Sequence, residues 1–317
     1  METNAPVPTP QDYDDEIDLR ELFSVLWEGK IQIIAVVLVS ALISVSIAVY
    51  LPNKYTAEAV LAPRSSGGGG GLAQLASQYG GLASLAGINI GGLGEGDSAA
   101  VAKEMLKTRD FFGAYLYEAV LVDLMAAKSW NLATDTLAID DTIFDVQSRK
   151  WIRDADPGRQ VEPSIQEAHE AFVESHLSVS EDKQTGLVKV SITHLSPSVA
   201  KDWVNLLIKG INEAVRARDV REAENSIEFL NEQRLKTNLV SLTEVFSELI
   251  EEQTKTVMLA NASDEYVFQV IEPPVAPELK SEPSRALICV LGTMLGGMLG
   301  VVLVLIRHYA LKPQEAE

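Results

Sequence analysis

Two stretches without a charged residue, 31–51 and 286–306, constrain the fold more than any other feature of this sequence. Each is 21 residues long, and a helix of that length spans roughly 31 Å, which matches the roughly 30 Å hydrocarbon core of a bilayer. The alternatives are a buried core helix and, for the first stretch, a cleaved signal peptide. A signal peptide begins with a basic segment, whereas the 30 residues before the first stretch hold eight carboxylates against Arg20 and Lys30. The sequence therefore predicts two transmembrane helices.

Two spans place residues 1–30 and 307–317 on one side of a membrane and the 234 residues 52–285 on the other. Lys and Arg near the span ends normally orient a membrane protein. Here the counts within about 15 residues tie at both spans: Arg20 and Lys30 against Lys54 and Arg64, then Lys280 and Arg285 against Arg307 and Lys312. The charge pattern therefore leaves the sidedness open.

The composition excludes several classes of protein. The chain carries 26 basic and 45 acidic residues, so a nucleic-acid partner is not expected. A hydrophobic content of 47 % argues against disorder. The single cysteine, Cys289, lies in the second span and excludes a disulfide framework and a cysteine zinc site. A translocated domain without disulfides is ordinary for a bacterial periplasm and unusual for a eukaryotic ectodomain.

The region between the spans reads as a mixture of helices and strands, an α+β class. Residues 55–62, 177–179, 186–194 and 266–271 have strand character, and residues 98–130 and 163–176 have helical spacing. Before the first span, residues 14–27 predict an amphipathic helix at the membrane surface. Residues 67–96 hold 12 of the 21 glycines without the Gly-Lys-Ser/Thr of a phosphate loop, which predicts a flexible loop.

A long helix is expected over residues 196–261. Ser196 is a favourable N-cap and Pro197 a favourable first helical residue. A continuous helix of this length would be roughly 95 Å long and would need another helix or a neighbouring subunit to cover its apolar stripe. The nearly all-polar residues 216–225 leave open a break or a solvent-bridging segment there.

Two features beside the second span are candidate functional elements. Pro273, Pro274, Pro277 and Pro283 lie within twelve residues, and such a segment favours a stiff, extended connector. Inside the span, a tandem GxxxG pattern with one adjacent glycine predicts a face for close helix packing: Gly292, Gly296, Gly297 and Gly300. The partner of this face is left open between the first span, a neighbouring copy and another membrane protein.

No catalytic or cofactor site is expected. His169 and His176, near Glu170 and Glu174, favour incidental surface histidines over a metal site. Asp154 and Asp156 form a DxD pattern that reads as a turn, because no nucleotide-binding motif surrounds it. The pair Asp140 and Asp141 reads as a solvated surface, and GxSxG and HExxH motifs are absent from the sequence.

This layout resembles the polysaccharide co-polymerases, specifically the Wzz-type O-antigen chain-length determinants. The resemblance is carried by DEIDLRELFSVLWEGK before the first span, KYTAEAVLAP after it, DEYVFQVIEPPVAPE, and PPVAPELKSEPSRA leading into the GxxxG-bearing second span. It covers the whole chain, most weakly over residues 100–195. The Gly-rich segment is similar to an insert of some members.

The resemblance implies a bacterial inner-membrane protein with both termini cytoplasmic and the central domain periplasmic. It implies an α/β base domain with a long extended helix or a helical hairpin, assembled into a ring-shaped homo-oligomer. The implied function is a non-enzymatic regulator of lipopolysaccharide O-antigen chain length that acts on the Wzy-type polymerase, with the growing polysaccharide as a further candidate partner. No cofactor is implied, and the related cytoplasmic tyrosine kinase is not expected in residues 307–317.

Two rival functions are retained as hypotheses. One is a membrane adaptor for capsule or exopolysaccharide polymerisation or export, which works with a separate kinase or transporter. The other is a two-span receptor, which is disfavoured because 30 and 11 terminal residues leave little room for a signalling module.

Overall fold

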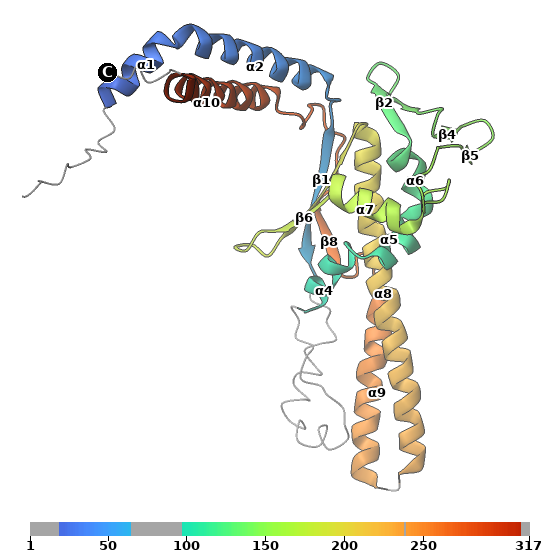
Figure 1. Ribbon diagram of the computed structural model, residues 1–317. Helices are drawn as coiled ribbons and strands as arrows, with labels where there is room; N and C mark the ends of the chain where they lie inside the picture. Colours follow the sequence, from blue (N-terminus) through green and yellow to red (C-terminus); the bar gives the residue numbers. More distant parts are fainter. Residues whose placement is uncertain (1–18, 65–96, 238, 312–317) are drawn as a thin grey trace, which may run out of the picture. The chain divides into compact units, whose positions relative to one another are not determined.

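The computed structural model describes residues 19–64, 97–237 and 239–311, and they fall into two compact units (Figure 1). One unit joins the two ends of the chain, up to Pro52 and from Pro283. The other runs from Asn53 to Glu282. We refer to them as the membrane unit and the central domain. The predicted glycine-rich loop at 67–96 lies outside the described residues.

The membrane unit consists of α1 (Leu19–Glu28), α2 (Lys30–Tyr50) and α10 (Arg285–Leu311). Two helices, Lys30–Tyr50 and Arg285–His308, are long and apolar enough to cross a membrane, with mean hydropathies of 2.7 and 2.5. Their hydrophobic side chains are mostly exposed, unlike those of a core helix in a water-soluble protein. The described part of α1 is amphipathic, and Phe23 stacks on Trp27 at its exposed side.

The central domain is built on an antiparallel sheet of four strands in the order β6-β7-β1-β8. These strands are β1 (Tyr55–Pro63), β6 (Leu177–Glu181), β7 (Val188–His194) and β8 (Phe268–Glu272). Alternate residues of β1, namely Ala57, Ala59 and Leu61, are buried on one face. Strand β1, which follows α2 in the sequence, is therefore an inner strand of the sheet. It pairs with β8, which is the last strand before α10.

The buried face of this sheet is covered by helices. These are α4 (Asp97–Met105), α5 (Arg109–Tyr115), α6 (Tyr117–Met125), α7 (Ile165–Ser175) and the first half of α8 (Pro197–Lys236). Trp203, Leu207 and Ile211 of α8 lie in the same core as Phe112 and Phe172. The core therefore holds the first half of α8 and leaves the second half to extend beyond it (Figure 1).

The helical spacing expected over residues 98–130 is confirmed up to residue 125, where the chain forms three short helices, and is wrong beyond it. Thr108 caps α5, and its side chain accepts a hydrogen bond from the backbone N–H of Phe111, so the chain starts a new helix there. Residues 127–151 then form two small hairpins: β2 (Ala127–Asn131) with β3 (Thr136–Ile139), and β4 (Phe144–Asp145) with β5 (Lys150–Trp151). Asp135 and Arg149 adopt positive φ angles of 47° and 52° in the two turns.

The long element is a helical hairpin and not one continuous helix over 196–261. Ser196 caps α8 and Pro197 opens it as predicted, and α8 runs 40 residues, roughly 60 Å, to Lys236. Thr237 is extended, and α9 (Val240–Asn261) returns along α8. The turn-back lets the hairpin bury Ala223, Leu230 and Ala260, whereas a single extended helix would leave more of its apolar stripe in water.

The polar segment 216–225 is helical and does not break α8. Its side chains pair along the helix surface: Arg216 with Glu213, and Arg218 with Asp219 and Glu222. The pairs of Arg216 with Glu213 and of Arg218 with Glu222 are three and four residues apart, and pairs at this spacing support a helix whose surface is polar. The break instead follows Arg234 and Lys236, whose positive charges complement the C-terminal end of a helix.

Candidate functional site: the membrane helix pair, the connector and the helical hairpin

Helices α2 and α10 pack against each other through small residues. Three glycines of α10 each face a residue of α2: Gly292 faces Ser44, Gly296 faces Ser40 and Gly300 faces Ile33. A Cβ atom on Gly296 would lie 2.5 Å from the Cβ atom of Ser40, and one on Gly300 would lie 3.1 Å from the Cα atom of Ile33. Side chains on these glycines would therefore force the helices apart.

The fourth glycine of the pattern is different. A Cβ atom on Gly297 would lie 3.9 Å from Val37, which is ordinary van der Waals contact. A glycine that the sequence analysis did not single out, Gly29, is closer to α10, because a Cβ atom there would overlap the side chain of Val304. Gly29 stands between α1 and α2, and only the position of α10 shows why it is small.

The proline-rich connector lies beside the start of β1. The backbone N–H of Lys54 donates to the carbonyl of Glu282 at 2.9 Å, and the N–H of Ser281 donates to the carbonyl of Lys54 at 2.9 Å. The hydroxyls of Thr56 and Ser281 are 2.7 Å apart. Of the four prolines of the connector, Pro274 is buried, Pro277 and Pro283 are half-buried and Pro273 is exposed. The two ends of the central domain are thus bonded to each other.

One buried side chain joins β8 to α8. The Oδ1 atom of Asn212 accepts the N–H groups of Val267 and Phe268 at 2.8 and 2.9 Å. Its Nδ2 atom donates to the carbonyls of Ile208 and Phe268, each at 3.1 Å. Sequence reasoning missed this residue, since a lone Asn in a long helix carries no signal. Asn212 fixes the strand that leads to the connector onto the helix that forms the hairpin.

The helical hairpin carries large apolar side chains on its outer surface. Ala223, Leu230 and Ala260 are buried within it. In contrast, a second set of apolar side chains is exposed, most strongly near the turn: Phe229, Leu235, Leu239, Val240, Leu242, Met258 and Leu259. The Oε1 atom of Glu252 is buried without a hydrogen-bond partner among the described residues. Within the described part of the chain, the hairpin therefore leaves apolar area and one acceptor without partners.

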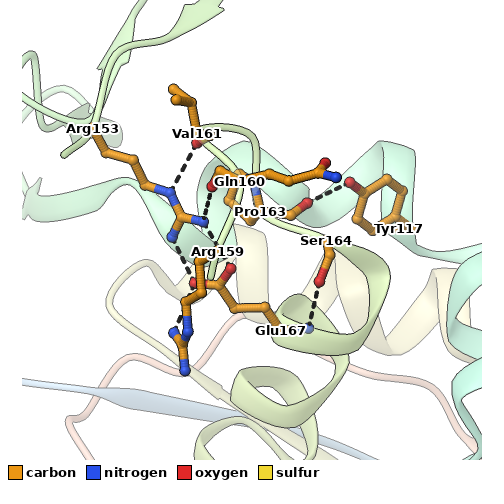
Figure 2. Close-up of polar contacts among 8 residues, drawn as sticks. All are labelled: Tyr117, Arg153, Arg159, Gln160, Val161, Pro163, Ser164 and Glu167. Atoms are coloured by element: carbon orange, nitrogen blue, oxygen red, sulfur yellow. Dashed lines mark hydrogen bonds and ion pairs between the residues drawn. The ribbon is translucent and has the colours of Figure 1, made fainter. Parts of the chain in front are cut away.

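A polar cluster holds the segment between β5 and α7 (Figure 2). The guanidinium of Arg153 donates to both carboxylate oxygens of Glu167 at 2.6 and 2.7 Å, and to the carbonyls of Val161 and Gln160 at 2.9 Å each. Arg159 donates to the same carboxylate at 3.0 Å. These hydrogen bonds from Arg153 hold the pKa of Glu167 below its usual range. These bonds engage all three guanidinium nitrogens of Arg153. The cluster therefore stabilises the segment that precedes α7 and is not a ligand site.

The histidines considered as metal ligands point to different partners. The Nε2 atom of His169 lies 2.8 Å from the carbonyl oxygen of Lys107, and the Nδ1 atom of His176 lies 2.7 Å from that of Thr193. The region that the structure describes contains no group of three or more His, Cys, Asp or Glu side chains arranged to hold a metal ion. In the DxD segment, the carbonyl of Asp156 accepts the N–H of Arg159, which closes a turn.

The expectation of a surface histidine is wrong for His176, which forms a largely buried pair with His194. The two rings lie 5.6 Å apart, and both contact the ring of Trp203. The Nδ1 atom of His194 accepts the N–H of Ser196 at 3.1 Å, so its Nε2 atom carries the proton and donates to the carbonyl of Asp123 at 3.2 Å. Burial, with His194 close by, lowers the pKa of His176 to about 4, and burial also lowers the pKa of His194. Both rings are therefore neutral at pH 7.

These features define a class: a chain with two candidate membrane helices, a mixed α/β domain between them in the sequence and a helical hairpin within that domain. Residues 15–119 match the family model of the Wzz domain, described as the chain length determinant protein. Residues 228–309 match a second model, the G-rich domain found on a putative tyrosine kinase. The first match covers the N-terminal leg and β1, and the second covers α9, β8 and most of α10.

Comparison with individual proteins agrees with the first match. The chain is 24 % identical over 325 residues to the chain length determinant protein of Salmonella typhimurium, covering 93 % of this chain and 92 % of that protein. The chain is thus a relative of the Wzz-type chain length determinants, and the resemblance stated from the sequence is confirmed.

Two solved structures were also matched. A full-length bacterial polysaccharide co-polymerase aligns over 96 % of this chain and 100 % of its own, with 14 % identity and a TM-score of 0.38. A fragment of WzzB, a polysaccharide co-polymerase from Salmonella Typhimurium, aligns over 73 % of this chain and 100 % of its own, with 13 % identity and a TM-score of 0.32.

Proposed function

We propose that this protein is a non-enzymatic regulator of lipopolysaccharide O-antigen chain length. In this proposal it is an inner-membrane scaffold that acts on a Wzy-type polymerase. The observation that carries the proposal is the Wzz domain at residues 15–119, in a chain aligned along nearly its whole length with a chain length determinant protein. The proposed topology has both termini in the cytoplasm and the central domain in the periplasm.

The proposed scaffold is a homo-oligomer whose neighbouring copies contact each other through the hairpin. The hairpin exposes Phe229, Leu239, Val240 and Met258 by 54 to 74 %. Large exposed apolar patches on a folded protein mark interaction sites. A second copy of the chain would supply matching apolar area from its own hairpin. The proposed packing role of the α2–α10 glycines is to keep the two legs of each copy together.

The direct test is deletion of the gene in its native strain, followed by electrophoresis of the lipopolysaccharide. We expect the O-antigen ladder to lose its clustering around a modal length, while short and long chains are still made. Complementation with the full chain restores the cluster. An unchanged ladder in a strain without a second chain length determinant would contradict the proposal.

A second candidate function is a membrane adaptor for capsule or exopolysaccharide synthesis. The match of residues 228–309 to the G-rich domain of putative tyrosine kinases favours it. This function requires a separately made kinase or transporter as the partner. Affinity capture of the full chain from native membranes discriminates the two functions. A polymerase of O-antigen units supports the first, and a kinase together with a loss of capsule in the deletion strain supports the second.

A further inference from the structure

A groove of about 510 Å³ lies in the central domain, between the start of α5 and the middle of α8 (Figure 1). This volume is within the usual range of ligand pockets in proteins, about 300–1,000 Å³. On the side of α8, the small residues Ala214 and Ala217 are followed at helical spacing by Arg218, Arg221 and Asn225, so one face of the helix lines the groove.

The side of the groove formed by α5 is aromatic. The rings of Phe111 and Tyr115 are stacked, with their centroids 5.4 Å apart. They pack on α8 at Gly210, where a Cβ atom would lie 3.2 Å from the Cβ atom of Tyr115 and 3.4 Å from the ring of Phe111. A glycine inside a helix costs about 1 kcal/mol relative to alanine, and the close approach of the two rings accounts for it here. Phe111 is buried and Tyr115 is half-buried, so the ring available to a ligand is that of Tyr115.

A guanidinium in the groove is held in position. The Nε and Nη2 atoms of Arg218 donate to the Oδ1 atom of Asp219 at 3.1 and 2.9 Å, and the Oδ2 atom of Asp219 accepts the hydroxyl of Tyr266 at 3.0 Å. The Nη1 atom of Arg218 lies 3.9 Å from the sulfur of Met105, which is a weak acceptor. Nη1 therefore retains donor capacity, and its position is fixed before a ligand binds.

Other polar side chains of the groove are without partners. Asp110, Arg221 and Asn225 make no hydrogen bond or ion pair with any residue in the part of the chain that the structure describes. With Arg218 and Glu222, the groove contains two guanidinium groups and two carboxylates, so its formal charges balance. It therefore offers donors and acceptors for hydrogen bonds without a net field for an ion.

This combination of groups suits a saccharide. One face of a pyranose ring presents C–H groups, which pack on the electron-rich face of an aromatic ring. Its neighbouring hydroxyls match side chains with two polar atoms, such as carboxylates, amides and guanidinium groups. A phosphate or a strongly acidic polymer favours an excess of positive charge, which this groove lacks. An apolar ligand favours a mainly apolar lining, whereas polar side chains make up more than half of the residues here.

We infer that the groove between α5 and α8 binds a short segment of an uncharged or weakly charged glycan. Tyr115 provides the stacking surface. Arg218 and Arg221 donate hydrogen bonds to sugar hydroxyls, and Asp110 accepts them. The inference rests on the proposed function for the identity of the glycan, which is then the growing O-antigen. Its consequence is that each copy of the scaffold contacts the polymer through its own central domain.

Saturation-transfer difference NMR of the full chain in lipid nanodiscs tests this inference. Nanodiscs are preferred because many detergents carry sugar headgroups that would compete. The probe is the O-polysaccharide released from the lipopolysaccharide of the native strain and cut into short fragments. Polygalacturonate fragments of similar length are the anionic comparison. The variants are Arg221→Ala and Asp110→Ala, both at exposed positions, and Arg234→Ala is the matched control, because Arg234 is exposed on α8 outside the groove.

We expect wild type to bind the O-polysaccharide fragments. Arg221→Ala and Asp110→Ala should each raise the dissociation constant by about tenfold, because each removes hydrogen bonds to a charged group. Arg234→Ala should leave it unchanged, and unchanged thermal unfolding by circular dichroism establishes that each variant is folded.

Equal dissociation constants for wild type and both groove variants, or no binding to wild type, would overturn the inference. Tighter binding of polygalacturonate than of the O-polysaccharide would overturn the assignment to a weakly charged glycan. The lipopolysaccharide ladder of the deletion strain tests the proposed function separately. A ladder that keeps its modal cluster would contradict that function whatever the binding result, so the two failures are distinguishable.

Discussion

Asn212 shows how much of this fold depends on a single amide. Its two polar atoms make four hydrogen bonds inside the core, two of them to Phe268 of β8 and one to Val267, the residue before that strand. The sequence gives no hint of this, because the partners are 55 and 56 residues away. The glycines of α10 are the opposite case: their spacing alone marks a packing face, and Gly297 and Gly29 show that only the partner helix decides which glycines matter.

Replacing Asn212 with leucine should destabilise the central domain by about 2–4 kcal/mol, because the N–H groups of Val267 and Phe268 lose their acceptor in a buried site. Thermal unfolding of the detergent-solubilised full chain, followed by circular dichroism, measures this. Asn205→Leu is the matched control, since Asn205 is exposed on the same helix. Equal melting temperatures for the two variants would show that the amide does not hold β8.

The buried histidine pair should make the stability of the central domain depend on pH. The pKa of His176 is lowered to about 4 by burial, so the unfolded state binds more protons than the folded state between pH 6.5 and 4. Stability is then full above pH 6.5 and falls as the pH decreases through this window, by about 2–3 kcal/mol for this ring. Lys54 adds to the lowering, whereas burial raises the pKa of Asp123 and offsets part of the loss near its lower end.

Urea unfolding of the full chain at pH 7.5 and pH 4.5 measures this loss. His176→Gln should reduce the difference between the two pH values, while His169→Gln, whose ring is not in the pair, should leave it unchanged. A wild-type chain equally stable at both pH values would contradict a neutral buried pair.

At the scale of helices and strands, composition and residue pattern predicted several elements correctly. The sequence predicted two apolar spans, the N-terminus of α8 and the strands β6 and β7, because each has a local cause: absence of charge, a cap followed by proline, or alternation. The hairpin of α8 and α9 was left open beside one long extended helix, since Thr237 and Leu239 carry no glycine or proline signal that would fix the turn. The small strands β2 to β5 were missed because two to five residues are too few to show a period.

Gly296→Leu should separate α2 from α10, because the closest approach of the helices at Ser40 leaves no room for a side chain. Spin labels at Ile47→Cys and Leu287→Cys, in a Cys289→Ala background, report the separation by pulsed electron spin resonance. We expect the mean distance to increase by about 2–4 Å and the distribution to broaden. Gly297→Leu is the control and should leave the distance unchanged. An equal effect of both substitutions would argue against a specific face.

The outer surface of the helical hairpin should determine the oligomeric state. Phe229→Glu combined with Met258→Glu places charge on two exposed apolar positions, which should leave the fold intact and weaken contacts between copies. Mass photometry of the detergent-solubilised chain should show a smaller assembly than wild type. Glu228→Lys, also exposed on α8, is the control. A double variant with the wild-type mass would place the contacts elsewhere.

At the scale of the whole molecule, charge and hydropathy are separated along the chain. The formal charge is −19 although the mean hydropathy is +0.09, because the two spans hold no charge and residues 52–285 hold 22 basic and 35 acidic residues. An acidic central domain is a poor tight binder of an acidic polymer. The proposed scaffold role therefore fits this charge better than tight binding of an acidic polysaccharide would.

The lipopolysaccharide ladder of a deletion strain complemented by hairpin variants tests the central claim most directly. Wild type and Glu228→Lys should each restore clustering around one modal length. Phe229→Glu with Met258→Glu, at equal membrane abundance, should give a ladder that decays smoothly with length. A deletion strain that keeps its cluster, or a dissociated double variant that fully restores it, would contradict the account of an oligomeric chain length determinant.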